Sequence, residues 1–149
     1  MNKIILTIGL ALFTITGAFA QLESPVTWSY AAKKINATSA ELYIKATIDE
    51  GWHLYSQFLK PGGPNKTTIA FTPSKDFALV GTTTEPKPIT YFDKTFKMDV
   101  SYFADQVVFR QKIKLNANST VVKGKIEFMV CDDSRCLPPD EVAFSIPVK

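Results

Sequence analysis

Hydrophobic and polar residues alternate in short stretches along most of the chain from Val26 onward. In residues 40–49, every second residue from Leu42 to Ile48 is apolar. Residues 107–115 repeat this period of two, and Gln111 is the one polar member of their apolar face. Because successive side chains of a β-strand point to opposite faces, the pattern predicts strands with one buried face.

The same criteria predict eight or nine strands, separated by Pro, Gly and Asn residues that favour turns. The expected strands are Val26–Lys34, Ala40–Asp49, Trp52–Gln57, Lys66–Thr72, Ala78–Thr82, Phe96–Phe103, Val107–Leu115, Val121–Val130 and Val142–Val148. Tyr91 and Phe92, between Pro88 and Asp93, are expected in a loop. No amphipathic helical segment of useful length is present. The sequence therefore predicts an all-β fold, an immunoglobulin-like antiparallel β-sandwich.

The first twenty residues have the features of a secretory signal peptide. Lys3 supplies a positive charge, residues 4–15 are mostly apolar, and residues 18–20, Ala-Phe-Ala, form a small-x-small cleavage site. An uncleaved membrane anchor is the alternative, but a span requires about 20 apolar residues. We therefore predict a signal peptide over residues 1–20 and one exported domain over residues 21–149.

The composition narrows the classes of partner. Hydrophobic residues make up 46% of the chain, which excludes a disordered tail. The formal net charge is only +3 and no block of like charges occurs, so we expect no nucleic-acid partner. No apolar run after residue 20 approaches the length of a membrane span, so we expect no membrane insertion after signal cleavage.

The candidate chemistry lies in the only two cysteines, Cys131 and Cys136, which are separated by four residues. An oxidising compartment makes a disulfide between them the default expectation. So short a ring contributes only about 2 kcal/mol of stability, against about 4 kcal/mol or more for a long loop. Short bridged rings beside turns also tend to be strained and easier to reduce. A redox-active pair and a passive structural staple both remain open.

Metal binding is a further alternative for the same residues. Two cysteines and the single histidine, His53, cannot complete a four-ligand zinc site without carboxylates or a second molecule. Met98 and Met129 could join them in binding Cu(I), but isolated methionines at strand spacing are more typical of core packing. We predict no metal site and no cofactor.

Three segments carry a resemblance to a known family. Residues 128–139, Phe-Met-Val-Cys-Asp-Asp-Ser-Arg-Cys-Leu-Pro-Pro, resemble the active-site hairpin of the N-terminal periplasmic domain of the thiol:disulfide interchange protein DsbD. Residues 49–56 are similar to that family's aromatic strand, and residues 88–96 lie where its cap loop would fall. The resemblance implies an immunoglobulin-like fold, a periplasmic location and a two-cysteine redox centre.

The resemblance also implies roles for individual residues. Cys131 and Cys136 would be the redox pair, with Cys131 as the attacking thiol. Tyr91 and Phe92 would form an aromatic lid over the pair. Tyr55 and His53 would line the pocket beneath it, and His53 stands where better-known members have a tyrosine. These members also have a longer insert between the cysteines and an aromatic residue at the position of Leu137.

The implied partners are a membrane electron donor of DsbD type acting in trans and oxidised periplasmic thiol proteins as acceptors. The domain would shuttle electrons from the first to the second through its cysteine pair. The competing function is a non-catalytic, immunoglobulin-like binding or adaptor module whose disulfide only stiffens a hairpin.

Charged residues next to the cysteines give opposing signals. Arg135 beside Cys136 would favour a thiolate, whereas Asp132 and Asp133 beside Cys131 would oppose one. The two carboxylates have a simpler interpretation as caps of the turn. For His53, the alternatives are a proton acceptor for a thiol and a partly exposed strand histidine without a partner.

Overall fold

The computed structural model describes residues 23–149, and the predicted signal peptide lies outside the described residues. Residues 23–149 form eleven β-strands and contain no helix. The strands are β1 (Val26–Asn36), β2 (Ser39–Ile48), β3 (His53–Tyr55), β4 (Thr68–Phe71), β5 (Phe77–Thr84), β6 (Ile89–Asp93), β7 (Met98–Phe103), β8 (Gln106–Leu115), β9 (Thr120–Phe128), β10 (Val130–Cys131) and β11 (Asp140–Val148).

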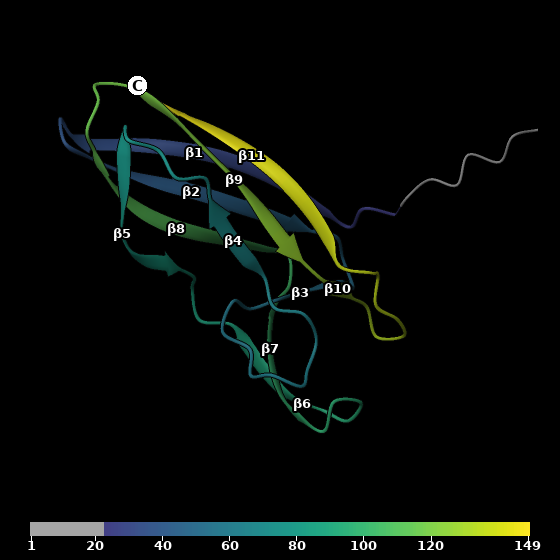
Figure 1. Ribbon diagram of the computed structural model, residues 1–149. Coiled ribbons are helices and arrows are strands. Elements are labelled where there is room, and N and C mark those ends of the chain that lie inside the picture. Colours follow the sequence, from purple (N-terminus) through teal and green to yellow (C-terminus); the bar gives the residue numbers. More distant parts are fainter. Residues whose placement is uncertain (1–22) are drawn as a thin grey trace, which may run out of the picture.

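The strands form two packed sheets and a third sheet of short strands, all antiparallel. One sheet has the order β1-β2-β8-β5 and the sheet facing it has the order β11-β9-β4. The small sheet, β10-β3-β7-β6, lies at the end of the sandwich away from the C-terminus (Figure 1). The prediction of an all-β, immunoglobulin-like sandwich is confirmed.

The main core fills the space between the two packed sheets, as the period-two pattern requires. Leu42 and Phe109 from one sheet and Ile126 from the other are fully buried. The buried Gln111 is satisfied by the edge strand β5. Its amide Nε2 donates to the carbonyl oxygens of Val80 (3.2 Å) and Lys112 (2.8 Å), and its Oε1 accepts from the Thr83 hydroxyl (2.9 Å). The bonds to Val80 and Thr83 hold β5 where its register shifts between Val80 and Thr84.

Gly124 in β9 permits the closest approach within the second sheet. A Cβ atom there would collide with the backbone carbonyl of Ala70 in β4 and would lie 2.8 Å from Cε1 of Phe144 in β11. The Phe144 ring occupies the space above the glycine and contacts Phe71 edge to face, with centroids 5.6 Å apart. Only a residue without a side chain fits at this position.

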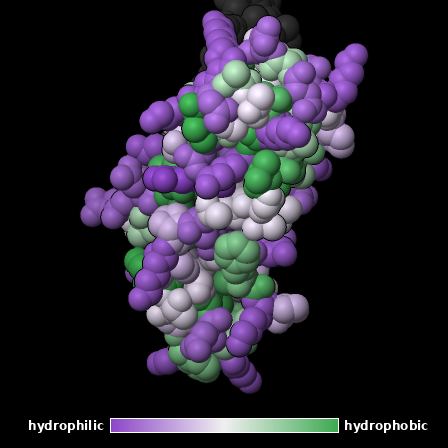
Figure 2. Space-filling model, turned by 90° about the vertical axis from the view of Figure 1, so that its left-hand side faces the viewer, coloured by the Kyte–Doolittle hydropathy of each residue, from purple (hydrophilic) through white to green (hydrophobic). Residues whose placement is uncertain are grey.

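The edge strand β5 lies at the left of Figure 1, on the side that faces the viewer in Figure 2. Figure 2 shows a largely hydrophilic surface in which hydrophobic residues form separate patches. Leu79 and Val80 of β5 are about half exposed, at 46% and 50%. Scattered exposed apolar side chains of this kind are normal on a protein surface.

The predicted single strand over residues 121–130 is wrong, because the chain changes sheets at Met129. β9 ends at Phe128 and pairs with β11 and β4, whereas Val130 and Cys131 pair with β3 of the small sheet. An uninterrupted alternation of side chains cannot reveal such a change of partner. The transfer is what carries the cysteine segment away from the sandwich and onto the small sheet.

The predicted loop around Tyr91 and Phe92 is also wrong, because residues 89–93 form strand β6, which pairs with β7 along its whole length. Proline disfavours central strands but is tolerated beside an edge strand, and Pro88 lies just before β6. Strand β3 is shorter than the predicted 52–57. It ends at Tyr55, and the Glu85 carboxylate then accepts hydrogen bonds from the Ser56 hydroxyl and the Gln57 backbone N–H (3.0 Å).

Candidate redox site

The small sheet has one face toward the main core and one face toward an open cavity. Leu54, Phe103 and Val130, which lie opposite one another across the strands, belong to the main core. The neighbouring residues in each strand point the other way. This second face carries a smaller cluster of buried residues that includes Tyr55, Val100 and Cys131.

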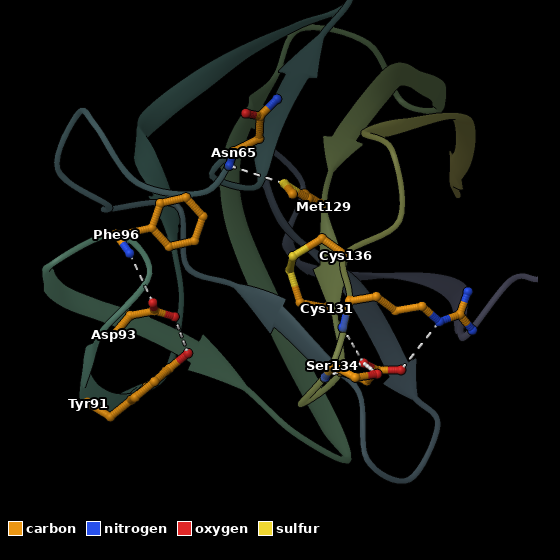
Figure 3. Close-up of a disulfide and its surroundings, with 10 residues drawn as sticks. Asn65, Tyr91, Asp93, Phe96, Met129, Cys131, Ser134 and Cys136 are labelled. Atoms are coloured by element: carbon orange, nitrogen blue, oxygen red, sulfur yellow. Dashed lines mark hydrogen bonds and ion pairs between the residues drawn. A yellow bond between two sulfur atoms is a disulfide. The ribbon is translucent and has the colours of Figure 1, made fainter.

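Cys131 and Cys136 are joined by a disulfide, and their Cα atoms are 3.9 Å apart (Figure 3). Two backbone hydrogen bonds fold the connecting residues back, from Asp132 N–H to Arg135 O (2.8 Å) and from Leu137 N–H to Val130 O (3.0 Å). Cys131 is only 4% exposed, whereas Cys136 is exposed. The two cysteine residues of the disulfide therefore differ in their exposure to solvent.

Asp132 holds the turn between the cysteines. Its carboxylate accepts hydrogen bonds from the backbone N–H groups of Ser134 and Arg135, both at 2.7 Å, and from the Ser134 hydroxyl at 2.9 Å. These bonds stabilise the ionised form and lower the pKa of the Asp132 carboxyl. The geometry agrees with the interpretation of this carboxylate as a cap of the turn.

The Arg135 side chain is engaged by acidic and aromatic neighbours. Its guanidinium pairs with the Glu23 carboxylate and, at 3.6 Å, with Asp132. It also lies over the Trp52 ring, 5.4 Å from the centroid. Two carboxylates thus offset the positive charge that was expected to favour a thiolate at Cys136.

An open cavity of about 800 Å³ lies between the disulfide loop and the β6–β7 hairpin. All eight site residues expected from the sequence line it, and the structure thus brings them together. These are His53, Tyr55, Tyr91, Phe92, Cys131, Asp132, Arg135 and Cys136. The other lining residues are Asp93, Lys94, Thr95, Phe96, Tyr102, Asp133 and Ser134.

Sequence reasoning missed Tyr102 and Phe96 as cavity residues. Tyr102 lies opposite Tyr55 in the β3–β7 pair, and its ring packs on that of His53 with centroids 4.3 Å apart. Phe96 was assigned to the start of a strand but lies in the hairpin turn before β7. Knowledge that β3 pairs with β7 would have identified Tyr102 as a cavity residue. The turn signal at Asp93 and Thr95 would have placed Phe96 in the hairpin turn and not in the strand.

Asp93 organises the tip of the β6–β7 hairpin. Its carboxylate accepts hydrogen bonds from the Tyr91 hydroxyl (2.7 Å) and from the backbone N–H groups of Thr95 (2.7 Å) and Phe96 (3.1 Å). Burial acts to raise the pKa of Asp93, but these bonds outweigh it and the pKa is lowered. Burial and the bond to Asp93 raise the pKa of Tyr91.

The aromatic residues of this hairpin differ in exposure. Tyr91 contacts the Tyr102 ring edge to face, with centroids 5.4 Å apart, while Phe92 is 60% exposed. Phe96 is partly buried. In the view of Figure 3 its ring points from the hairpin turn toward the disulfide.

The two methionines considered as Cu(I) ligands pack in the small hydrophobic cluster with Cys131. The Met129 sulfur accepts a hydrogen bond from the Asn65 backbone N–H, at 3.4 Å (Figure 3). Within residues 23–149, no group of three or more His, Cys, Asp or Glu side chains is arranged to hold a metal ion. No helix in the same residues is long and apolar enough to cross a membrane.

Residues 22–147 match the family model described as thiol:disulfide interchange protein DsbD, N-terminal. The chain belongs to the DsbD N-terminal domain family. It is therefore a thiol–disulfide exchange domain, and Cys131–Cys136 is its cysteine pair. The domains of this family are periplasmic. No curated protein matches the chain in sequence.

Solved structures of low sequence identity share the fold. The N-terminal domain of Neisseria meningitidis DsbD in its reduced form aligns with a TM-score of 0.53 and 16% identity, over 74% of this chain and 84% of its own. The N-terminal periplasmic domain of ScsB from Proteus mirabilis gives 0.59 and 16%, over 85% and 47% of the two chains. A chain of the complex between the DsbD and PilB N-terminal domains of N. meningitidis gives 0.50 and 12%, over 78% and 80%.

Proposed function

We propose that this domain carries electrons to oxidised periplasmic thiol proteins through Cys131 and Cys136. The observation that supports the proposal most strongly is the position of the disulfide. It bridges a short loop at the rim of an open cavity, with one sulfur-bearing residue exposed and one buried. Disulfides that serve only stability gain most by closing long loops, and this one closes a ring of about six residues.

The difference in exposure assigns different tasks to the two cysteines. Cys136 is the exposed residue and would form the mixed disulfide with a partner. The buried Cys131 would then attack the Cys136 sulfur and release the partner as a thiol. This order is the reverse of the one that the family resemblance implied, in which Cys131 attacks first. The greater exposure of the Cys136 residue is the physical reason for preferring it.

The β6–β7 hairpin would act as the shield of the disulfide. Tyr91 and Phe92 were expected to form the lid, and the partly buried Phe96 joins them as a third candidate from the hairpin turn. Because Asp93 ties the turn together, the hairpin tip would move as a unit when a partner displaces it. Tyr55 and His53 would remain beneath as the floor of the cavity.

The electron donor would be a membrane protein of DsbD type acting in trans. One thiolate of a donor dithiol would attack Cys136 in the oxidised domain and form a mixed disulfide. The second thiol of the donor would then attack the donor sulfur in that bond and release the domain in its reduced form. Export through the predicted signal peptide would place the domain in the periplasm with both its donor and its acceptors.

Two measurements test this function together. Equilibration of the domain in glutathione buffers should give a reversible couple with a potential above about −300 mV, because structural disulfides lie below that value. Cys131→Ser should trap oxidised periplasmic proteins as mixed disulfides through Cys136, identified by mass spectrometry. Cys136→Ser is the matched control and should trap far less protein.

If the domain is instead a non-catalytic adaptor module, the same two measurements should give the opposite results. A binding module with a structural disulfide would resist mild reduction, and neither single-cysteine variant would capture a partner covalently. Either result would refute the electron-carrier function.

A further inference from the structure

His53 lies directly opposite Cys131 in the two-residue ladder between β3 and β10. Side chains that face each other across an antiparallel pair lie on the same face, with Cβ atoms about 4.5–5.5 Å apart. Both residues line the cavity. The only histidine of the chain is therefore the cross-strand neighbour of the buried cysteine.

The His53 ring is positioned by packing and not by hydrogen bonds to other side chains. Tyr102, from the strand on the other side of β3, packs against it with centroids 4.3 Å apart. No hydrogen bond within residues 23–149 engages its ring nitrogens. The imidazole is partly exposed in the cavity, so its nitrogens are available to exchange a proton.

The proposed exchange leaves a negative charge on the Cys131 sulfur when the disulfide opens. When a partner thiolate attacks Cys136, the Cys131 sulfur leaves with the electron pair of the broken bond. A thiolate at a residue that is only 4% exposed is unfavourable, because burial disfavours the charged form. The buried sulfur therefore needs a proton as the disulfide opens and must lose one before the disulfide closes.

The other polar groups of the cavity are less suited to supply that proton. Asp132 and Asp93 have carboxylates held in the ionised form by hydrogen bonds, and Arg135 is paired with Glu23 and Asp132. The pKa of Tyr91 is raised by burial and by its bond to Asp93. Histidine is the one side chain whose ordinary protonation change falls between pH 5 and 8.

The titratable and charged side chains that share the cavity with His53 come from the four strands of the small sheet and from two connecting segments. They are Tyr55 on β3, Tyr91 and Asp93 on β6, Lys94 in the following turn, Tyr102 on β7, Cys131 on β10, and Asp132, Asp133, Arg135 and Cys136 in the loop after β10. Cys131 is the one directly paired with His53 in the ladder between β3 and β10.

We propose that His53 is the acid–base group of Cys131 in thiol–disulfide exchange. In the reductive direction the partner thiolate forms a bond to the Cys136 sulfur and the Cys131–Cys136 bond breaks. The Cys131 sulfur takes the electron pair and receives the proton of the His53 imidazolium, which becomes neutral. When the domain passes its electrons on, the Cys136 thiolate attacks the acceptor disulfide, whose S–S bond breaks as the mixed disulfide forms. His53 then takes the proton from Cys131, the Cys131 sulfur attacks the Cys136 sulfur, and the acceptor sulfur leaves as a thiolate.

The inference rests on the proposed function for its biological meaning, but its test needs no partner protein. Reduced Cys136→Ser leaves Cys131 as the only thiol, and the ultraviolet absorbance of its thiolate can be followed against pH. Adding His53→Gln should raise the pH at which the thiolate appears by about one unit, which is about a tenfold loss of thiolate near pH 7.

Thr90→Val in the same background is the matched control. Thr90 bonds to Ser101 on the opposite face of the small sheet and does not line the cavity, so its replacement should leave the titration unchanged. A His53→Gln curve that coincides with that of the parent would overturn the proposal, whether or not the domain exchanges disulfides with any partner.

A second measurement uses the unsubstituted protein and does not depend on the folding of a variant. Because His53 is the only histidine, its ring protons give one assignable set of NMR signals. In the reduced protein these signals should report two titration steps, since the imidazole and the Cys131 thiol are coupled. The oxidised protein has no thiol and should show one step. Identical single-step curves in both states would refute the coupling.

Discussion

Reduction of the disulfide is expected to leave this domain folded, with only a modest loss of stability. The expectation follows from the position of the bridge, since Cys131 and Cys136 are five residues apart and already lie in one hydrogen-bonded hairpin. An electron carrier must remain folded in both states. A protein that relied on the bridge for its fold could not alternate between them.

The size of the loss can be worked from the ring that the bond closes. A loop of about six residues restricts the unfolded chain little, and the chain-entropy relation gives about 2 kcal/mol at 25 °C. For a domain of this size the same change lowers the melting temperature by roughly 8 °C. By linkage, folding makes the pair only about 45 mV harder to reduce than it is in the unfolded chain.

Urea denaturation of three samples measures this loss. The free energy of unfolding is compared for the oxidised domain, the domain in excess reductant, and Cys136→Ser. Cys136 is exposed, so its replacement removes the bridge with little loss of packing, and the variant should match the reduced domain. Cys136→Ser has no disulfide, so the reductant should not change its free energy of unfolding. This sample controls for effects of the reductant other than opening of the disulfide.

A loss of 4 kcal/mol or more, or unfolding on reduction, would refute the reasoning. It would place the bridge among the disulfides on which small secreted domains depend for their fold. The loop-entropy estimate would then have missed a structural role of the bond, and the carrier function would lose its physical basis.

Three further predictions test the supporting structure. Gly124→Ala should destabilise the domain by about 3 kcal/mol in urea denaturation, because the added methyl group collides with backbone, whereas Gly51→Ala meets open space and should cost only about 1 kcal/mol of conformational strain. The pKa of Asp132 is lowered in the folded domain, so its carboxylate contributes fully to stability at pH values above its pKa in the unfolded chain. This contribution is lost as the pH falls through the pKa in the folded domain. Thermal melts at a series of pH values should show a smaller acid-dependent loss of stability in Asp132→Asn. Tyr91→Phe removes a hydrogen bond to the Asp93 carboxylate, so the pKa of Asp93 measured by NMR should rise.

The sequence by itself determined the fold class and the strands of the sandwich. The alternation in residues 40–49 and 107–115 corresponds closely to β2 and β8, and even the buried Gln111 was placed on the correct face. This success has a simple cause, since a strand with one buried face records that face in every second residue. The cysteine spacing likewise gave the disulfide, because residues so close in sequence need no knowledge of distant partners.

The tertiary structure decided what surrounds the cysteines. The transfer of the chain from one sheet to another at Met129 leaves no mark in the alternation, yet it is the event that pairs Cys131 with His53. Tyr102 joins the cavity only because β7 pairs with β3. Exposure also separates Cys136 from Cys131, and the spacing of the two cysteines does not predict this difference. Period-two patterns report which face of a strand is buried, but the neighbour on each side is set by long-range pairing, and the redox site is built from such neighbours.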